Sequence, residues 1–166
     1  MIVKARCWKF GDNIPSDLIT PITIIFKGYD YIAQHVLERV RPEFPKEMKK
    51  GDIIVAGKNW ACSSGRTTAP KGLRIAGVGL VIAESFSRTF FRNASEVGLP
   101  ILECPGVTAK INDADVLEVE VTTGVIKNLT TGETIQATPP PPFQIELIKH
   151  GGLLKYLEEK GLPTNV

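Results

Sequence analysis

The sequence has few of the residues that build metal centres and covalent cross-links. Its 166 residues include three cysteines and two histidines. Cys7, Cys62 and Cys104 are far apart and form no C-x-x-C motif, and an odd count argues against a disulfide framework. Their spacing fits neither a zinc site nor an iron–sulfur cluster held by this chain alone. We therefore predict that this chain binds no metal.

Long apolar runs and concentrations of one charge are also lacking. No stretch approaches the roughly 18 apolar residues of a membrane-spanning helix, and the opening MIVKARCWKF has no signal-peptide pattern, so we expect a cytoplasmic protein. Lys and Arg number 20 against 18 Asp and Glu, and the basic residues are scattered, which does not support nucleic-acid binding. The composition, 43% hydrophobic and 23% charged, is typical of a globular protein, and the length predicts a single domain over 1–166.

Short apolar strands alternate with helical segments along most of the chain. An α/β unit with parallel pairing is predicted from strands at 2–10, 53–57, 78–83 and 99–104 and helices at 31–40, 70–77 and 85–98. Ser85 is the expected N-cap of the last of these helices, and Gly98 its end. An antiparallel meander is expected over 115–137, where alternating strands are joined by TTG turns. Two closing helices, broken at Gly151–Gly152, are expected over 143–161.

A polar segment, GKNWACSSGRTTAP at 57–70, joins the second predicted strand to the next helix. Loops at the carboxyl ends of parallel strands are where α/β folds bind ligands, and small residues at a helix start let backbone N–H groups approach an anion. Arg66 adds a bidentate partner for a carboxylate, and Ser63 and Ser64 add hydroxyls. The segment predicts a site for a small polycarboxylate or a phosphate. On spacing alone, a capped helix start with a solvated arginine is an equally good interpretation.

Four blocks of the sequence resemble the small subunits of 3-isopropylmalate dehydratase: GDNIPSDLITP, GDIIVAGKNWACSSGR, VIAESFSRTFFRNASEVGLPILEC and GGLLKYL. The resemblance covers most of the chain in order and spacing. It implies the swivelling β/β/α domain of the aconitase superfamily, which caps a separate large subunit carrying a [4Fe–4S] cluster.

The same resemblance implies the chain's activity and its partner. The chain would be the small subunit of a heteromeric hydro-lyase, active only with the large subunit, on 3-isopropylmalate in leucine biosynthesis. The alternatives are a homoaconitase or substituted-malate dehydratase subunit, or a non-catalytic binding module that kept the fold.

The family's loop usually reads G-x-N-F-G-C-G-S-S-R-E-H-A. In aconitases its first Ser is the base that abstracts the substrate proton, and its Arg binds a substrate carboxylate. By resemblance, these roles fall to Ser64 and Arg66 here. Gly65 replaces the second Ser, and Ser63 stands where a Gly is usual. The backbone N–H groups of residues 64 and 65 are then expected to face developing negative charge.

Asp17 and Lys27 complete the expected substrate contacts, beside Ser63, Gly65 and Arg66. Asp17 matches an acid of the family's DTD stretch, with Ser16 in place of its Thr. Lys27 is the one cation in ITIIFKGYDY, the stretch that takes the place of the specificity loop in relatives, and it can meet an extra carboxylate. Alternatively, the apolar residues 24–26 line an apolar pocket, or belong to the core or to an interface.

Overall fold

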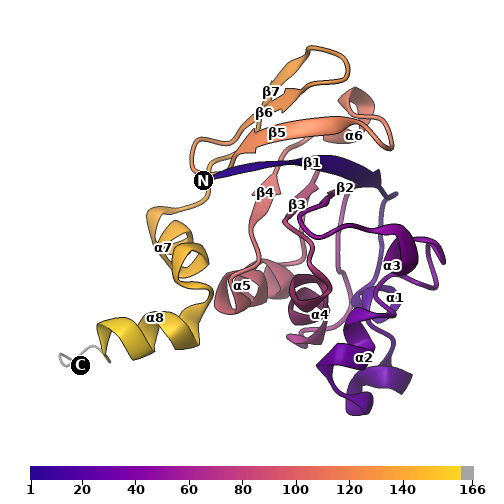
Figure 1. The fold of residues 1–166 in the computed structure, drawn as a ribbon, viewed down its shortest axis with the longest axis vertical. Coiled ribbons are helices and arrows are strands. Elements are labelled where there is room, and N and C mark those ends of the chain that lie inside the picture. Colours follow the sequence, from indigo (N-terminus) through magenta and orange to yellow (C-terminus); the bar gives the residue numbers. More distant parts are fainter. Residues whose placement is uncertain (162–166) are drawn as a thin grey trace.

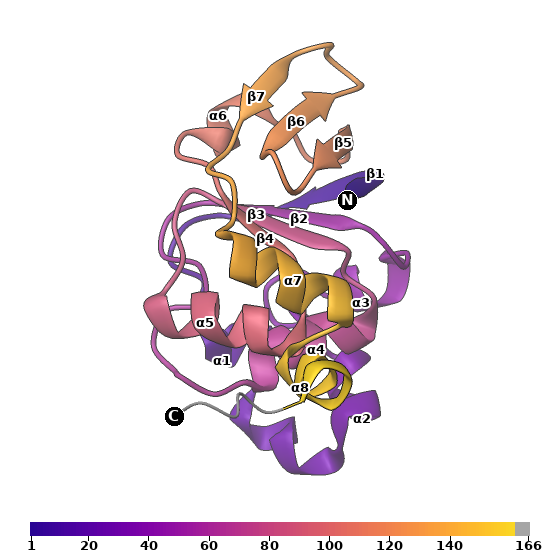
Figure 2. The ribbon, with the colours of Figure 1, turned by 90° about the vertical axis from the view of Figure 1, so that its left-hand side faces the viewer.

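The computed structural model describes residues 1–161, in which a curled seven-stranded sheet carries most of the helices on one side (Figures 1 and 2). Its strand order is β4-β3-β2-β1-β5-β6-β7. The strands are β1 (Ile2–Lys9), β2 (Ile53–Ala56), β3 (Leu80–Ala83), β4 (Ile101–Glu103), β5 (Val116–Glu120), β6 (Val125–Asn128) and β7 (Thr134–Gln136). The helical segments are α1 (Ser16–Ile19), η1 (Ile22–Lys27), α2 (Tyr29–Ala33), α3 (Phe44–Glu47), α4 (Thr68–Ala76), α5 (Arg88–Val97), α6 (Val107–Lys110), α7 (Pro142–His150) and α8 (Leu153–Lys160).

The central strand β1 joins a parallel half of the sheet to an antiparallel half. The neighbouring strands β1–β2, β2–β3 and β3–β4 pair in parallel. The neighbouring strands β1–β5, β5–β6 and β6–β7 pair antiparallel. The predicted parallel unit and the predicted meander are both confirmed. All residues of β2 and β3 are buried, as parallel strands covered on both faces require.

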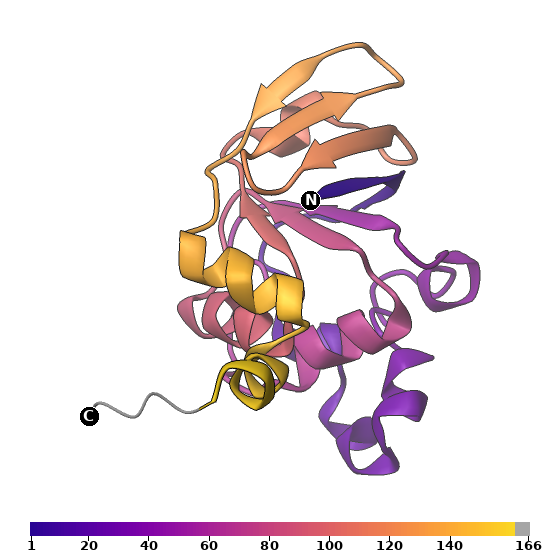
Figure 3. The ribbon, with the colours of Figure 1, turned by 60° about the vertical axis from the view of Figure 1, so that its left-hand side comes forward.

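Two hydrophobic clusters lie on opposite sides of the parallel strands. Because successive strand side chains point to opposite faces, Ile54 belongs to the cluster under the helices, and Ile53 to the cluster enclosed by the curled meander. Trp8, Phe44 and Trp60 fill the first cluster. The helices α7 and α8 pack beside α5, and their chain breaks at Gly151–Gly152 as predicted (Figure 3).

The helix predicted over 31–40 is wrong beyond its first turn. The helix α2 ends at Ala33, and the chain continues through successive turns to residue 40. Leu37 adopts a left-handed conformation with φ +59°, and its N–H donates to the carbonyl of Ile19 at 2.9 Å. The apolar stripe is buried as expected, but a folded loop buries it. Residues 41–52, which lead from these turns to β2, contain the short helix α3.

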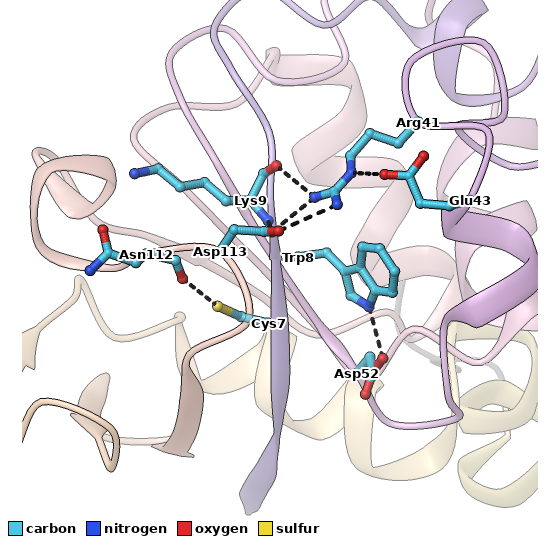
Figure 4. A network of polar contacts seen from close by, with 8 residues as sticks. All are labelled: Cys7, Trp8, Lys9, Arg41, Glu43, Asp52, Asn112 and Asp113. Atoms are coloured by element: carbon cyan, nitrogen blue, oxygen red, sulfur yellow. Dashed lines mark hydrogen bonds and ion pairs between the residues drawn. The ribbon is translucent and has the colours of Figure 1, made fainter.

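A polar network fixes the carboxyl end of β1 (Figure 4). The Arg41 guanidinium donates to Asp113 Oδ1 at 2.8 Å, and the Lys9 N–H donates to the same oxygen at 2.7 Å. Burial opposes ionisation of Asp113, but these hydrogen bonds hold the pKa of its carboxyl below the usual value. The buried Trp8 indole donates to Asp52 at 2.8 Å. These contacts hold the strand end from which the chain enters residues 11–16.

Candidate functional site

Two irregular loops continue the parallel pairing of β1 and β2 beyond the strand ends. Residues 11–16 follow β1, and residues 57–63 follow β2. The N–H of Asn13 donates to Lys58 O at 2.7 Å, that of Ala61 to Ile14 O at 2.8 Å, and that of Ser16 to Cys62 O at 2.9 Å. The pairing brings the start of α1 against the serine-rich segment, although about 48 residues separate them in sequence.

The backbone of these loops is strained at residues that are not glycine. Asn13, Asn59, Ala61 and Ser63 have φ values of 55°, 56°, 57° and 85°. Asparagine tolerates this region, and Asn59 donates to Asn13 Oδ1 at 2.8 Å. Alanine and serine tolerate it less, at a cost on the order of 1 kcal/mol each, and such residues persist where their surroundings hold them. Strain of this kind gathers at functional sites, so the loop is a strong candidate.

The segment between β3 and α5 supports the second loop from the other side. The carbonyl of Ser85 accepts from Trp60 N–H, and the Ser85 hydroxyl accepts from Asn59 N–H, both at 2.9 Å. The Ser87 hydroxyl donates to Ala61 O at 2.8 Å. The prediction of Ser85 as the N-cap of α5 is therefore wrong. Ser87 caps that helix by accepting from Phe90 N–H, and Ser85 holds the loop.

The serine cluster lies between α1 and the start of α4. The buried hydroxyl of Ser16 accepts from Ser64 N–H at 3.0 Å and lies 3.4 Å from Ser63 Oγ. The Ser64 hydroxyl accepts from Arg66 N–H at 3.3 Å. The Ser64 amide is thus already bonded, and the expectation that it faces an anion is wrong. The Gly65 amide has no partner within residues 1–161.

Arg66 and Asp17 form an ion pair that joins two predicted site residues. The Arg66 side chain is 36% exposed and that of Asp17 is 53% exposed, so both face solvent. One terminal nitrogen of Arg66 meets Asp17, while its Nε is buried with no partner among the described residues. The guanidinium is therefore held in place with donors to spare.

Two further residues were harder to place from the sequence. The side-chain amide of Asn93, in α5, donates to Gly65 O at 2.8 Å, and no local sequence pattern predicts this contact. Lys27 forms no hydrogen bond or ion pair with the other five predicted site residues, all of which the structure describes. Its ammonium lies 4.5 Å from the centre of the Tyr31 ring.

The cysteines do not form a ligand set. Cys7 and Cys104 are buried in the core, and burial raises the pKa of both thiols, that of Cys7 to about 12. Cys62 lies half-buried in the site loop. Within residues 1–161, no three His, Cys, Asp or Glu side chains are grouped as metal ligands. The three cysteines, all within the described residues, therefore do not form the ligand set of an iron–sulfur cluster. No helix in the same range is long and apolar enough to cross a membrane.

The sequence of this chain is similar to known proteins over nearly its whole length. Residues 28–105 match the aconitase C-terminal domain. The isopropylmalate/citramalate isomerase small subunit of Methanocaldococcus jannaschii is 49% identical over 160 residues, which cover 96% of this chain and 95% of that protein. The chain belongs to the 3-isopropylmalate dehydratase small-subunit family.

Other relatives agree with this membership. The small subunit 1 of 3-isopropylmalate dehydratase from Thermotoga maritima is 44% identical over 96% of this chain and 97% of its own length. The crystal structure of a 3-isopropylmalate dehydratase (leuD) from Methanocaldococcus jannaschii matches with a TM-score of 0.90 and 35% identity, over 96% of this chain and 95% of that one. The expected swivel-type fold is confirmed, and so is the expected place of the chain as the small subunit of a hydro-lyase.

Proposed function

We propose that this chain supplies the proton-transfer and carboxylate-binding half of an active site that it shares with an aconitase-type large subunit, and that the substrate is 3-isopropylmalate. The observation that carries the proposal is the grouping of Ser64, Arg66 and Asp17 directly after two strained, mutually bonded loops. The [4Fe–4S] cluster implied by the resemblance belongs, in this proposal, to the large subunit.

Ser64 is the proposed base. A serine hydroxyl is a weak base unless its alkoxide is stabilised, and no histidine lies in the motif to activate it. The main-chain N–H of Arg66 already donates to Ser64 Oγ at 3.3 Å. A donor in this position favours the negatively charged form of that oxygen. The alkoxide takes a proton from the carbon next to the hydroxyl-bearing carbon of the substrate. The electron pair left behind forms the double bond as the C–O bond breaks, and the hydroxyl leaves with the electron pair of that bond and takes up a proton to become water.

Arg66 is the proposed carboxylate clamp. Asp17 occupies one edge of the guanidinium and fixes its direction, which leaves other N–H groups to form a fork with a carboxylate. The Gly65 amide, which has no partner within residues 1–161, and the hydroxyl of Ser63 are proposed as two further donors to this carboxylate. Asp17 therefore acts on the substrate through Arg66, by orienting it.

The segment η1 favours an apolar substituent on the substrate over an extra carboxylate. Phe26 is 92% exposed, whereas the Lys27 ammonium is engaged with Tyr31. An apolar surface of this kind suits the branched chain of 3-isopropylmalate. Citramalate is the second candidate, because it carries a small apolar substituent and the relative from Methanocaldococcus jannaschii is named for both compounds. Lys27 would contribute only to a tricarboxylate substrate, the homoaconitase alternative.

The test is reconstitution with the large subunit under anaerobic conditions, followed by assays on 3-isopropylmalate, citramalate, homocitrate and citrate. We expect turnover of 3-isopropylmalate, and a loss of turnover in Ser64→Ala without loss of the complex. Turnover of citrate or homocitrate alone would refute the substrate assignment. An intact complex that turns over none of the four compounds would support the non-catalytic alternative. Such an enzyme of small, soluble acids fits a cytoplasmic location and a single domain over the whole chain, and both are part of the proposal.

A further inference from the structure

The Ser16 hydroxyl lies beneath the loop that carries Ser64. Ser16 is 4% exposed and begins α1. Its Oγ accepts from Ser64 N–H at 3.0 Å and lies 3.3 Å from Cys62 O and 3.4 Å from Ser64 O. Since a hydroxyl has one proton, it donates to only one of its neighbouring oxygens, these two carbonyls or Ser63 Oγ at 3.4 Å, while it accepts the amide. Ser16 therefore contacts the peptide groups on both sides of the strained residue Ser63.

The helix α1 does not depend on the Ser16 hydroxyl for its own hydrogen bonds. The residue before it, Pro15, is the N-cap of α1, and no side chain caps that helix. The main-chain N–H of Ser16 is bonded separately, to Cys62 O. Removing the side-chain oxygen would leave α1 with its own hydrogen bonds and would leave the partly buried Ser64 amide without its partner.

We propose that Ser16 is a positioning residue for the reaction, which sets the direction of the Ser64 hydroxyl by holding the Ser64 amide. This inference rests on the proposed role of Ser64. Ser63, with φ +85°, is free to relax once the Ser64 amide is released, and the relaxation turns the Ser64 side chain. A displacement of about 1 Å in a catalytic group is enough to slow a reaction strongly.

An effect on Ser64 can be distinguished from an effect on Arg66, because Ser16 and its neighbour Asp17 contact different residues. Ser16 is buried and faces the Ser64 peptide, whereas Asp17 is exposed and faces Arg66. Loss of the Ser16 hydroxyl is therefore expected to lower kcat, which reports proton transfer. A disturbance that spread to Asp17 and the Arg66 clamp would instead raise KM.

The experiment uses the complex of this chain with its large subunit and three variants. Ser16→Ala removes the hydroxyl. Ser16→Thr keeps it and introduces the residue usual in the family. Ser95→Ala is the matched control, because Ser95 is also buried and its hydroxyl also bonds a carbonyl, that of Phe91 at 3.3 Å. We expect kcat to fall about tenfold in Ser16→Ala, as for one lost hydrogen bond, with KM unchanged. Ser16→Thr and Ser95→Ala are expected to keep kcat.

A double-variant cycle decides whether Ser16 acts through Ser64. In the Ser64→Ala background, Ser16→Ala is expected to have no further effect on the residual rate. An equal loss in both backgrounds would overturn the inference, as would a change confined to KM or a normal kcat in Ser16→Ala. Those outcomes leave the proposed function standing if Ser64→Ala is itself impaired. Near-normal turnover of Ser64→Ala would refute the proposed function and this inference with it.

Discussion

Replacing Gly57 with alanine tests whether the contact between the two site loops is as close as the structure indicates. Gly57 follows β2 with an ordinary backbone conformation, so alanine is not excluded by φ. A Cβ built there would lie 1.8 Å from Asp12 Oδ1 and 3.0 Å from the Asp12 backbone N. The carboxylate must therefore move, and the Asp12 backbone has little room to follow.

The cost follows from the hydrogen bond that the carboxylate makes. Asp12 Oδ1 accepts from Lys58 N–H at 2.8 Å, and the added methyl group would break this bond. A hydrogen bond to a charged group contributes about 1.5–3 kcal/mol when buried, and we take about 1 kcal/mol because Asp12 is exposed. Gly→Ala also stabilises by about 0.4–1 kcal/mol through the unfolded chain. Gly11→Ala is the matched control, because nothing lies within 4 Å of a Cβ at Gly11.

The assay is thermal unfolding of the purified chain. Relative to Gly11→Ala, the midpoint of Gly57→Ala is expected to fall by about 2–4 °C for each kcal/mol lost. In the Asp12→Ala background the carboxylate is gone and only the close contact with the backbone N of residue 12 remains, so Gly57→Ala is expected to cost less there. Equal midpoints for the two glycine variants, or additive losses in the double variant, would refute the reasoning.

Three other predictions concern the site and the fold. Ser64→Ala in the assembled enzyme should lower kcat by about 10²–10⁴-fold, whereas Ser63→Ala should be mild. Arg66→Lys keeps the charge but loses the fork, so KM should rise about tenfold while the complex still forms, and an unchanged KM would remove Arg66 from the site. Because the folded pKa of Asp113 is depressed, its stabilisation is present above its unfolded pKa of about 4 and is lost as the pH falls through the folded pKa. The difference in unfolding midpoint between wild type and Asp113→Asn should therefore be largest at neutral pH and shrink on acidification, and a constant difference would contradict this.

The predictable part of the fold is the part that local pattern determines. The segments IIVA and LVIA are buried strands because continuous apolar runs suit covered parallel strands. At 31–40 the spacing of apolar residues predicted correctly which side chains are buried, but the helix it predicted is wrong beyond Ala33. Val36 and Leu37 are fully buried as their spacing suggested, yet the N–H of Leu37 bonds Ile19, a partner that spacing cannot identify.

The candidate site was predicted in the same uneven way. The resemblance named Ser64, Arg66 and Asp17, and the structure brings Asp17 to Arg66 and Ser16 to Ser64. The expected Ser64 amide donor was wrong because the Ser16 hydroxyl, 48 residues away, already accepts from it. Such a partner depends on tertiary placement, which residue types alone do not reveal.

The exposure of the site explains why two subunits would be needed. A carboxylate bound at Arg66 on this chain would remain in contact with water, where a pair of unit charges 4 Å apart gains about 1 kcal/mol. Where a covering subunit lowers the effective dielectric constant to about 20, the same pair gains about 4 kcal/mol. A large subunit that covers Arg66 and Ser64 would raise both the attraction for the substrate and the effect of the Arg66 N–H on the Ser64 oxygen. In the proposed complex, the strained loops would hold these groups in position, and the large subunit would supply the surroundings in which they act.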